Sequence, residues 1–492
     1  DPTRSVDELV KVLFAVSECG PFAKSGGLAD VAGSLPKELK SLGTDVRVIL
    51  PKYGTIADEF KSEMKQVKEF TVSVGWRNQF CGIEELTYQG VTFYFVDNEY
   101  YFKREGLYGY FDDGERFAYF NRAVLETIAE LNFYPDVLHC HDWHTAMIPF
   151  LLRTEYHKRK GYGHIRTVFT IHNLQFQGIF PKEVLGDLLG MDYNSFHSGH
   201  LEFFGNINYM KGALVAADKI TTVSPTYKEE IQTPAYGEKL DGLLRARKED
   251  LIGILNGIDE DFYNPARDPL IYQTYTVNHH QKKAINKSEI QNHFGLPQSS
   301  RTPLLVMITR LTRQKGLDLV KCVLREILQE DVQVIVLGTG DYEYEEHLRQ
   351  AARIYPEKLK VHTGFSEGLA HKLYAAADLF LMPSQFEPCG LGQLIAMKYG
   401  AIPIVRETGG LNDTINSWNE FTGKGNGFSF SNFNAHDMLY TIKRALSVYH
   451  DSNSWNSIVK QAMEMDYSWA QSAYSYNQLY AEIVSRSETH VF

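Results

Sequence analysis

The stretch Lys24–Asp30, with the sequence Lys-Ser-Gly-Gly-Leu-Ala-Asp, returns near the other end of the chain as Glu407–Asp413, with the sequence Glu-Thr-Gly-Gly-Leu-Asn-Asp. Each copy follows an apolar run, Lys11 to Val16 for the first and Ala401 to Val405 for the second. Two glycines after a hydroxyl residue, at a turn from a strand into a helix, let backbone N–H groups approach a phosphate or sugar oxygen closely. The repeat predicts two similar nucleotide-binding halves that face one cleft.

Length and charge restrict the class of protein. A chain of 492 residues exceeds the usual size of one hydrophobic core, so two domains are expected. The formal charge of −11 argues against nucleic acid or an anionic membrane as the main partner, because both need a basic face. No apolar stretch approaches the 18 residues of a membrane span. A neutral polymer, or a small anion in a local basic pocket, remains compatible.

The five cysteines are scattered and odd in number, which indicates a reducing compartment without a disulfide framework. The segment from Asp1 to Leu9 is polar and carries no visible signal peptide, although a removed targeting segment would leave no trace. We therefore expect a cytoplasmic protein, or a protein of the plastid stroma if the chain is of plant type.

Short β-rich runs alternate with amphipathic helical patterns through most of the chain, which predicts α/β domains with parallel sheets covered on both faces. The pattern breaks from Tyr263 to Pro303, where polar stretches and the prolines 265, 269 and 297 suggest the crossing between domains. We expect an N-terminal Rossmann-like domain over residues 1–262 and a C-terminal one over 263–468. A last helix, Trp469 to Val484, is expected to pack back on the first domain.

Three basic residues lie where strands are expected to end. Lys24 comes just before the first Gly-Gly pair, where its ammonium group could neutralise a phosphate held by the loop amides. Arg310 and Lys315 follow the expected strand Leu304–Ile308, at the edge where α/β sheets bind ligands. The alternative for each residue is a solvent-exposed cation beside a turn, with no role in ligand binding.

The segment Phe386–Gln393 follows another expected strand and opens an expected helix, Gly390–Tyr399, whose free amides suit an anion. Glu387 would repel a phosphate there, so a hydrogen bond to a sugar hydroxyl is the better expectation. Cys389 has no partner in the sequence that marks it as a nucleophile, and we interpret it as a small packing residue.

The segment His139–His144 resembles a metal-binding cluster, with alternate side chains on one face of a strand. No further ligand stands at zinc spacing, so a strand end that lines a substrate pocket is the better interpretation. His172, at the end of the expected strand Thr167–His172, brings a second histidine to the same rim. The acidic run Asp259–Asp261 imitates a metal motif of sugar transferases, but it follows a turn signal. We therefore expect no metal.

These motifs occur in the order found in bacterial glycogen synthases and plant starch synthases, and the resemblance covers essentially the whole chain. It rests on Lys-x-Gly-Gly-Leu, His-Asp-Trp-His, Thr-x-His-Asn, Leu-Asn-Gly-Ile-Asp, Arg-Leu-x-x-Gln-Lys-Gly, Glu-Pro-Cys-Gly-Leu and Thr-Gly-Gly-Leu. The resemblance implies the GT-B fold, two Rossmann-like domains about a central cleft. It also implies an ADP-glucose:1,4-α-D-glucan 4-α-D-glucosyltransferase, with ADP-glucose and a glycogen or starch primer as its partners and no cofactor.

The resemblance carries roles onto matching positions. It implies catalytic roles for Lys24, His172, Arg310, Lys315 and Glu387. It implies donor contacts from Lys24, Gly27, Asp30, Asn256, Arg310, Lys315, Gly364, Phe365, Glu387, Cys389, Gly390 and Leu391. Glu18, Asp142, His144 and Asn173 are placed on the acceptor side or in the glucose pocket.

One position departs from the wider group of related folds. Those proteins carry a second glutamate eight residues after the first, where this chain has Ile395, with Gln393 nearby. No catalytic glutamate pair is assigned, and the absence of a clear carboxylate nucleophile favours a front-face retaining mechanism over a double displacement. Two rivals remain: a phosphorylase with lysine-bound pyridoxal phosphate, and an inactive glucan-binding scaffold.

Overall fold

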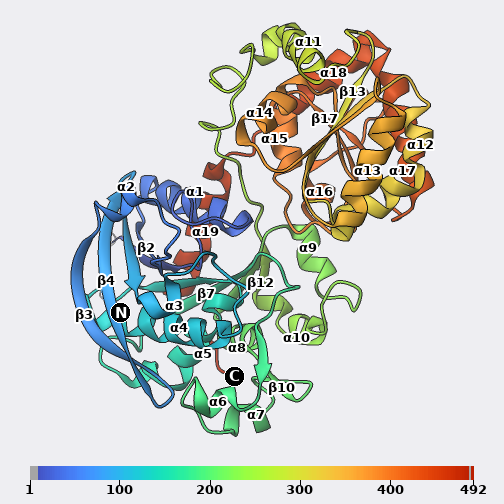
Figure 1. Ribbon diagram of the computed structural model, residues 1–492. Helices are drawn as coiled ribbons and strands as arrows, with labels where there is room; N and C mark the ends of the chain where they lie inside the picture. Colours follow the sequence, from blue (N-terminus) through green and yellow to red (C-terminus); the bar gives the residue numbers. More distant parts are fainter. Residues whose placement is uncertain (1–8, 487–488) are drawn as a thin grey trace. The chain divides into compact units, whose positions relative to one another are not determined.

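The computed structural model describes residues 9–486 and 489–492, which form two α/β units (Figure 1). Unit 1 contains the chain up to Val223, the segment Lys228–Asn256 and the C-terminal part from Trp469. Unit 2 contains Gly257–Ser468 together with the short segment Ser224–Tyr227. The residues 263–303, where the sequence pattern breaks, lie within unit 2.

Unit 1 is built on a nine-stranded sheet of order β12-β11-β7-β6-β1-β2-β5-β4-β3. The strands are β1 (Lys11–Ala15), β2 (Asp45–Pro51), β3 (Lys65–Val74), β4 (Arg77–Tyr88), β5 (Val91–Asp97), β6 (Val137–His141), β7 (Arg166–Ile171), β11 (Lys219–Thr222) and β12 (Leu251–Gly253). All neighbours from β12 to β5 pair in parallel, whereas β4 and β3 extend the sheet as an antiparallel hairpin. Strands β8 (Ile179–Pro181), β9 (Glu202–Phe203) and β10 (Asn206–Asn208) form a small separate sheet.

Two groups of helices cover the large sheet. Helix α1 (Gly27–Ser41) packs against α19 (Trp469–Val484), and helices α4 (Asp113–Glu130), α5 (Met147–Thr154) and α8 (Tyr209–Ala216) pack together on the other face (Figure 1). The short helices of this unit are α2 (Asp58–Lys61), α3 (Glu99–Phe102), α6 (Val184–Asp187), α7 (Asn194–His197) and α10 (Asp241–Ala246), while α9 (Pro225–Glu230) begins in the short segment assigned to unit 2 and ends in unit 1.

Helix α19 joins unit 1 through polar as well as apolar contacts. The Tyr480 hydroxyl lies 2.6 Å from Nδ1 of His139, and Thr44 Oγ1 donates to Oδ1 of Asn477 at 2.6 Å. Tyr480 and Ile483 are almost fully buried. The last helix is therefore part of the first unit's core.

Unit 2 is built on a six-stranded sheet of order β15-β14-β13-β16-β17-β18, and every neighbouring pair is parallel. The strands are β13 (Leu304–Ile308), β14 (Gln333–Gly338), β15 (Leu359–Thr363), β16 (Leu379–Met382), β17 (Ile402–Arg406) and β18 (Phe428–Phe430). Numbered along the chain, this order is 3-2-1-4-5-6, the doubly wound Rossmann arrangement. The strands β5-β2-β1-β6-β7-β11 of unit 1 repeat the same order.

Helices cover both faces of the second sheet. Helices α12 (Leu317–Leu328), α13 (Tyr342–Ile354) and α17 (Ala435–Tyr449) group on one face (Figure 1). On the other face lie α11 (Lys283–Phe294), α14 (Glu367–Ala376), α15 (Gly392–Lys398) and α18 (Ser452–Met463), with the short α16 (Gly409–Thr414) after β17. The central strands β13 and β14 are apolar along nearly their whole length because both of their faces are covered.

Candidate active site

Each sheet has one point where the strand order reverses, between β1 and β6 in unit 1 and between β13 and β16 in unit 2. The loops after these strands diverge there, so a crevice opens at their carboxyl ends, where ligands of such sheets bind. Glu18 follows β1, and Asp142 follows β6. Lys315 follows β13, and Glu387 follows β16. The candidate residues are thus concentrated at the two reversal points.

Lys315 and Glu387 form an ion pair at the reversal point of unit 2. Nζ of Lys315 lies 3.0 and 2.8 Å from the two carboxylate oxygens, and their side chains are only 13% and 9% exposed. Ser384 Oγ donates to the same carboxylate at 2.9 Å. The pair is therefore held as a rigid unit with little access for water.

Arg310 follows β13 directly and is exposed. No hydrogen bond or ion pair of its guanidinium group is recorded within the described part of the chain. Gly364 has a φ of +127° after β15, and its neighbour Phe365 is 75% exposed. These two residues lie at the carboxyl end of a different strand from Arg310, on the same edge of the sheet.

The second Gly-Gly pair packs against the loop that carries Glu387. A Cβ atom added to Gly409 would lie 1.8 Å from the carbonyl oxygen of Glu387, and one added to Gly410 would lie 1.8 Å from that of Cys389. The Gly410 amide donates to the carbonyls of Glu387 and Pro388 at 3.1 and 3.0 Å. This pair therefore supports the Glu387 loop, rather than lining an open ligand site as the repeat suggested.

The helix expected over Gly390–Tyr399 is shorter in the structure. Helix α15 begins at Gly392, and Gly390 has a φ of +73°, so Cys389, Gly390 and Leu391 form the turn before the helix. The amides expected to cap an anion thus belong to a left-handed turn. Sequence periodicity does not reveal such a turn, because it leaves the apolar spacing of the helix unchanged.

The first Gly-Gly pair is open. Gly26 and Gly27 are exposed, and a Cβ atom added to either would meet no other atom within 4 Å. Lys24 Nζ donates to Oδ1 of Asp30 at 2.8 Å across this loop. A cavity of about 510 Å³ adjoins the loop and is lined by Lys24 and Tyr108, among others. Unlike its counterpart, this loop leaves room for a ligand.

The side chain of Glu18 holds that loop in place through hydrogen bonds. Its carboxylate is buried and accepts hydrogen bonds from Ser25 N at 2.8 Å, Ser25 Oγ at 2.7 Å, Gly26 N at 3.0 Å and Tyr108 Oη at 2.9 Å. The amides of Ser25 and Gly26 are therefore occupied by the protein itself. At the start of α1 the Ala29 amide donates to the carbonyl of Gly26 at 3.2 Å, whereas the amides of Gly27 and Leu28 have no intrahelical acceptor and remain for a ligand.

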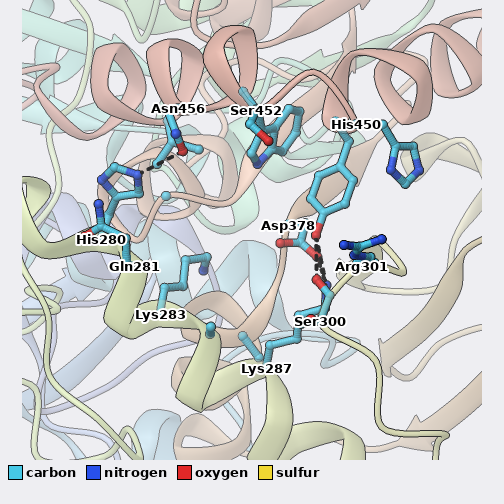
Figure 2. Close-up of a pocket in the computed structure, with 16 residues that line it drawn as sticks. His280, Gln281, Lys283, Lys287, Ser300, Arg301, Asp378, His450, Ser452 and Asn456 are labelled. Atoms are coloured by element: carbon cyan, nitrogen blue, oxygen red, sulfur yellow. Dashed lines mark hydrogen bonds and ion pairs between the residues drawn. The ribbon is translucent and has the colours of Figure 1, made fainter.

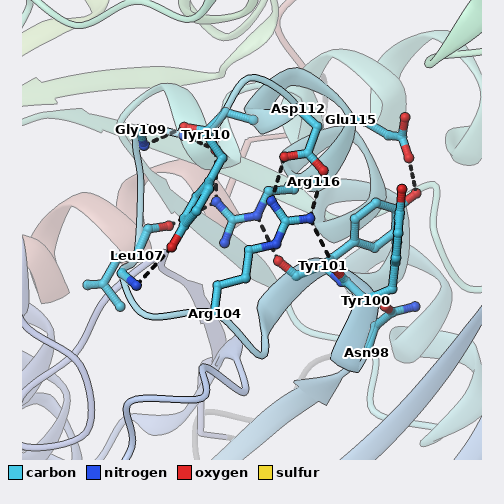
Figure 3. Close-up of polar contacts among 12 residues, drawn as sticks. Asn98, Tyr100, Tyr101, Arg104, Leu107, Gly109, Tyr110, Asp112, Glu115 and Arg116 are labelled. Atoms are coloured by element: carbon cyan, nitrogen blue, oxygen red, sulfur yellow. Dashed lines mark hydrogen bonds and ion pairs between the residues drawn. The ribbon is translucent and has the colours of Figure 1, made fainter.

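The loop that presents Tyr108 is fixed by a polar cluster (Figure 3). Arg116 is fully buried and donates to the carbonyls of Tyr101 and Leu107 at 2.7 and 3.0 Å. Arg104 forms a two-pronged pair with Asp112 at 2.6 and 2.7 Å. Such planar two-point contacts fix geometry as well as charge. The cluster therefore holds Tyr108 against Glu18.

Asp142 has a φ of +57°, which is strained for a residue other than glycine. Its carboxylate accepts a hydrogen bond from His172 N at 2.8 Å. Burial, together with the charge of Glu18, raises the pKa of Asp142 to about 7, although the amides of His172 and Asn173 oppose this shift. Asp142 thus joins the loop ends after β6 and β7, and the side chain of Asn173 accepts from Gln175 N at 2.9 Å.

Three imidazoles stack beneath the rim. The rings of His139 and His141 lie 4.2 Å apart, and Nδ1 of His141 lies 3.0 Å from Nε2 of His172. Burial lowers the pKa of His172 to about 3 and that of the other two well below its usual range. His172 is therefore neutral at neutral pH, and its Nε2 shares a hydrogen bond with Nδ1 of His141. No three potential ligands among the described residues are grouped to hold a metal ion.

His144 stacks on Tyr108, with ring centroids 4.3 Å apart, and burial lowers its pKa to about 3. Asn256 is buried at the end of the segment Lys228–Asn256 of unit 1. Sequence reasoning did not single out Ser384, Tyr108 or the role of His141. Their partners are distant in sequence or depend on a turn, so only the folded chain reveals them.

Comparison with known proteins follows the same division of the chain. Residues 11–246 match the family model described as starch synthase catalytic domain, and residues 288–462 match that of glycosyl transferases group 1. The structure is similar to the catalytic domain of starch synthase IV from Arabidopsis thaliana bound to ADP and acarbose. That match has a TM-score of 0.89 and 35% identity, over 97% of this chain and 100% of that one. The fold and its sites define a two-domain α/β glycosyltransferase of the GT-B class.

Sequence relatives narrow the class. A glycogen synthase of Anoxybacillus flavithermus is 62% identical over 482 residues, which cover 98% of this chain and 100% of the relative. A glycogen synthase of Geobacillus stearothermophilus is 63% identical over 479 residues, 97% of this chain and 99% of the relative. The chain belongs to the glycogen synthase family, which confirms the resemblance and the fold class expected from the sequence. No helix among the described residues is long and apolar enough to cross a membrane.

Proposed function

We propose that this enzyme transfers glucose from ADP-glucose to the non-reducing 4-OH end of an α-1,4-glucan, with retention at the anomeric carbon. The observation that carries the proposal is the buried Lys315–Glu387 pair at the β13–β16 reversal point, in a chain of the glycogen synthase family. The starch synthase with the similar structure was solved with ADP and acarbose, a nucleoside diphosphate and a sugar ligand, and this supports the choice of substrates.

The cations Lys24, Arg310 and Lys315 would hold the diphosphate. The Lys24–Asp30 pair is exposed, with 55% and 37% of the two side chains accessible, so a phosphate can displace the aspartate at little cost. The guanidinium group of Arg310 is exposed and suits two-point phosphate binding. Charge that develops on the departing ADP would thus meet preorganised positive groups. The turn Cys389–Leu391 and Gly27 would supply backbone amides.

Glu387 would bind the transferred glucose rather than act as a nucleophile. Its carboxylate already holds Lys315 and Ser384, and this leaves it oriented but not free to move toward carbon. Its remaining lone pairs can accept hydrogen bonds from sugar hydroxyls. Ser384 therefore serves as a positioning residue for Glu387.

His172 would lie beside the anomeric carbon. A neutral imidazole there does not repel the positive charge of an oxocarbenium-like state, and the low pKa of His172 keeps it neutral. We infer that the acceptor proton passes to the departing phosphate oxygen on the same face. That step breaks the glycosidic bond to ADP and forms the new bond to the acceptor oxygen without an enzyme nucleophile.

The two units would bind different substrates. Unit 1 would serve the acceptor side, with Glu18, Asp142, His144 and Asn173 at or near the glucose pocket. Unit 2 would hold the nucleotide sugar, with Gly364 and the exposed Phe365 flanking the base. Asn256, Asp30 and Gly27 complete the proposed donor contacts. The five cysteines form no disulfide, which supports a reducing compartment such as the cytoplasm.

The deciding experiment is glucan extension with ADP-glucose and UDP-glucose in parallel, each with and without a chelator. We expect transfer from ADP-glucose, linear growth of α-1,4 chains, and initial rates that EDTA leaves nearly unchanged. A product of inverted configuration, or no transfer from either donor, would refute the proposal. Loss of activity that Mg²⁺ or Mn²⁺ restores would refute its metal-free chemistry.

A further inference from the structure

Unit 2 contains a second cavity, of about 530 Å³, on the side away from Lys315 and Glu387 (Figure 2). Its lining includes Asp378, Arg301 and Gly400, which lie just before β16, β13 and β17 respectively. These positions mark the amino ends of the strands, whereas the proposed donor residues follow their carboxyl ends. The cavity is therefore separate from the donor site, although the same strands connect the two.

The cavity is rich in positive charge. Lys283, Lys287 and Arg301 line it with His280 and His450, and Asp378 is the one carboxylate among the lining residues. Asp378 is already neutralised, because its Oδ2 lies 2.8 Å from Nζ of Lys287 and also accepts from Leu304 N at 2.8 Å. The remaining formal charge of the lining is positive.

The buried Lys283 has no recorded ion pair among the described residues, although the negative charge of Asp378 favours its protonated form. Its Nζ donates to the carbonyls of Tyr374 and Ala375, at 2.9 and 2.6 Å, which end α14. Burial lowers its pKa to about 7. An anion in the cavity would relieve this unfavourable burial of positive charge. Binding of an anion at this site would therefore be favourable.

Arg301 is exposed at the mouth of the cavity, and no acidic partner is recorded for it among residues 9–486 and 489–492. Figure 2 shows Arg301 and His450 together on one side and His280 and Asn456 on the other, with Ser452 between the two groups. Ser452 begins the twelve-residue helix α18, whose N-terminus is already capped by Asp451, since Oδ1 of Asp451 accepts from Ser454 N at 3.4 Å. One side offers cations and the other offers polar groups suited to hydroxyls.

We propose that this cavity is a second ligand site that takes a small organic phosphate, with its phosphate at Arg301 and its hydroxyl-bearing body toward Asn456 and Ser452. A volume of about 530 Å³ suits a ligand larger than inorganic phosphate alone. A planar guanidinium with free donors is the side chain best matched to a phosphate monoester.

Isothermal titration calorimetry tests the proposal at saturating ADP, which keeps the donor site occupied. The probes are ribose 5-phosphate, inorganic phosphate and ribose. We expect ribose 5-phosphate to bind, inorganic phosphate to bind more weakly, and ribose not to bind. Arg301→Gln should weaken ribose 5-phosphate about tenfold or more, since it removes a charge-assisted contact.

Lys282→Gln is the matched control. It removes the same charge at the start of α11, beside the cavity but outside its lining, and should leave the affinity unchanged. Arg310→Ala, at the proposed donor site, should also leave it unchanged, so a failure of the donor assignment is distinguishable. The proposal is overturned if ribose 5-phosphate does not bind, if inorganic phosphate binds equally well, or if Arg301→Gln and Lys282→Gln weaken binding alike.

Discussion

Two lysine–carboxylate pairs in this enzyme have the same chemistry but different surroundings. Lys24 and Asp30 meet in solvent, where such pairs contribute about 0–1 kcal/mol to folding. Lys315 and Glu387 are buried, where removal of one partner leaves an uncompensated charge. The first pair can open for a ligand, and the second holds a fixed geometry.

This contrast predicts different outcomes for Lys24→Ala and Lys315→Ala. Both should lower the turnover number about 10²–10³-fold, because each removes a preorganised charge from the proposed donor site. Only Lys315→Ala should also lower the free energy of unfolding, by about 3 kcal/mol or more. Steady-state kinetics and urea unfolding measure the two effects. A Lys24→Ala enzyme within a few-fold of wild type would remove Lys24 from the mechanism.

Glu18 gives a second residue-scale prediction. One of its oxygens accepts from two amides and the other from two hydroxyls, which can also act as acceptors. A glutamine could therefore keep all four contacts. We expect Glu18→Gln to retain turnover within a few-fold, and Glu18→Ala to lose about 10²-fold because the loop is displaced.

Steady-state rates of the two Glu18 variants, with thermal unfolding as a control for folding, distinguish bracing from direct contact. If Glu18→Gln is as inactive as Glu18→Ala, the charge itself acts on the substrate and the bracing role is wrong.

Single residues could be predicted from the sequence where a motif carried them. Lys315 and Glu387 were singled out by their places after expected strands, and the structure brings them together. Tyr108 lies 90 positions from Glu18 and was not found, because no local pattern records that contact. The glycines of the two repeats look alike in sequence, yet one pair is open and the other is packed.

At the scale of elements, the two Gly-Gly turns predict opposite responses to one added methyl group. Gly410→Ala should destabilise the protein by about 1–3 kcal/mol and shift the Glu387 loop, because its Cβ cannot lie 1.8 Å from a carbonyl oxygen. Gly27→Ala, its counterpart in the first repeat, should unfold at the wild-type midpoint. The urea midpoints of both variants test this difference. An equal loss of stability in Gly410→Ala and Gly27→Ala would contradict it.

Most elements of the parallel sheets could be read from the sequence, because buried strands are apolar runs bounded by helices. The strand expected at Leu304–Ile308 matches β13 to the residue. The β3–β4 hairpin was missed, since much of it is exposed and polar. Helix α11 was missed because it lies in the stretch where proline and polar residues interrupt the pattern.

For the whole molecule, buried neutral histidines predict sensitivity to acid. His144 and His172 have a pKa of about 3 in the folded state, against 6.5 in an ordinary environment. The unfolded chain therefore binds protons below pH 6.5 that the folded chain does not, and stability falls as the pH falls from 6.5 toward 3. Each contributes a loss of about 2 kcal/mol between pH 6.5 and 5.

Asp142 has the opposite effect on the pH dependence of stability. It keeps its proton up to about pH 7 in the folded state and releases it near 3.8 otherwise, so it favours folding at acid pH. Urea unfolding at several pH values should still show a net loss below 6.5. His144→Phe keeps an aromatic ring against Tyr108 but cannot take up a proton. The free energy of unfolding of this variant should therefore fall less steeply as the pH is lowered. A slope unchanged in that variant would show that His144 does not contribute.

The place of α19 has a consequence for the order in which the chain is completed during synthesis. Unit 1 is begun first but lacks its last core helix until Trp469–Val484 has emerged, after nearly all of unit 2. Until then the face of α1, with the ring of His139 behind it, has no Tyr480 to cover it. Domains usually fold in the order of translation. In this enzyme nearly all of the second unit lies in one stretch of chain before α19, so it can fold first, and unit 1 is complete only after α19 has been synthesised.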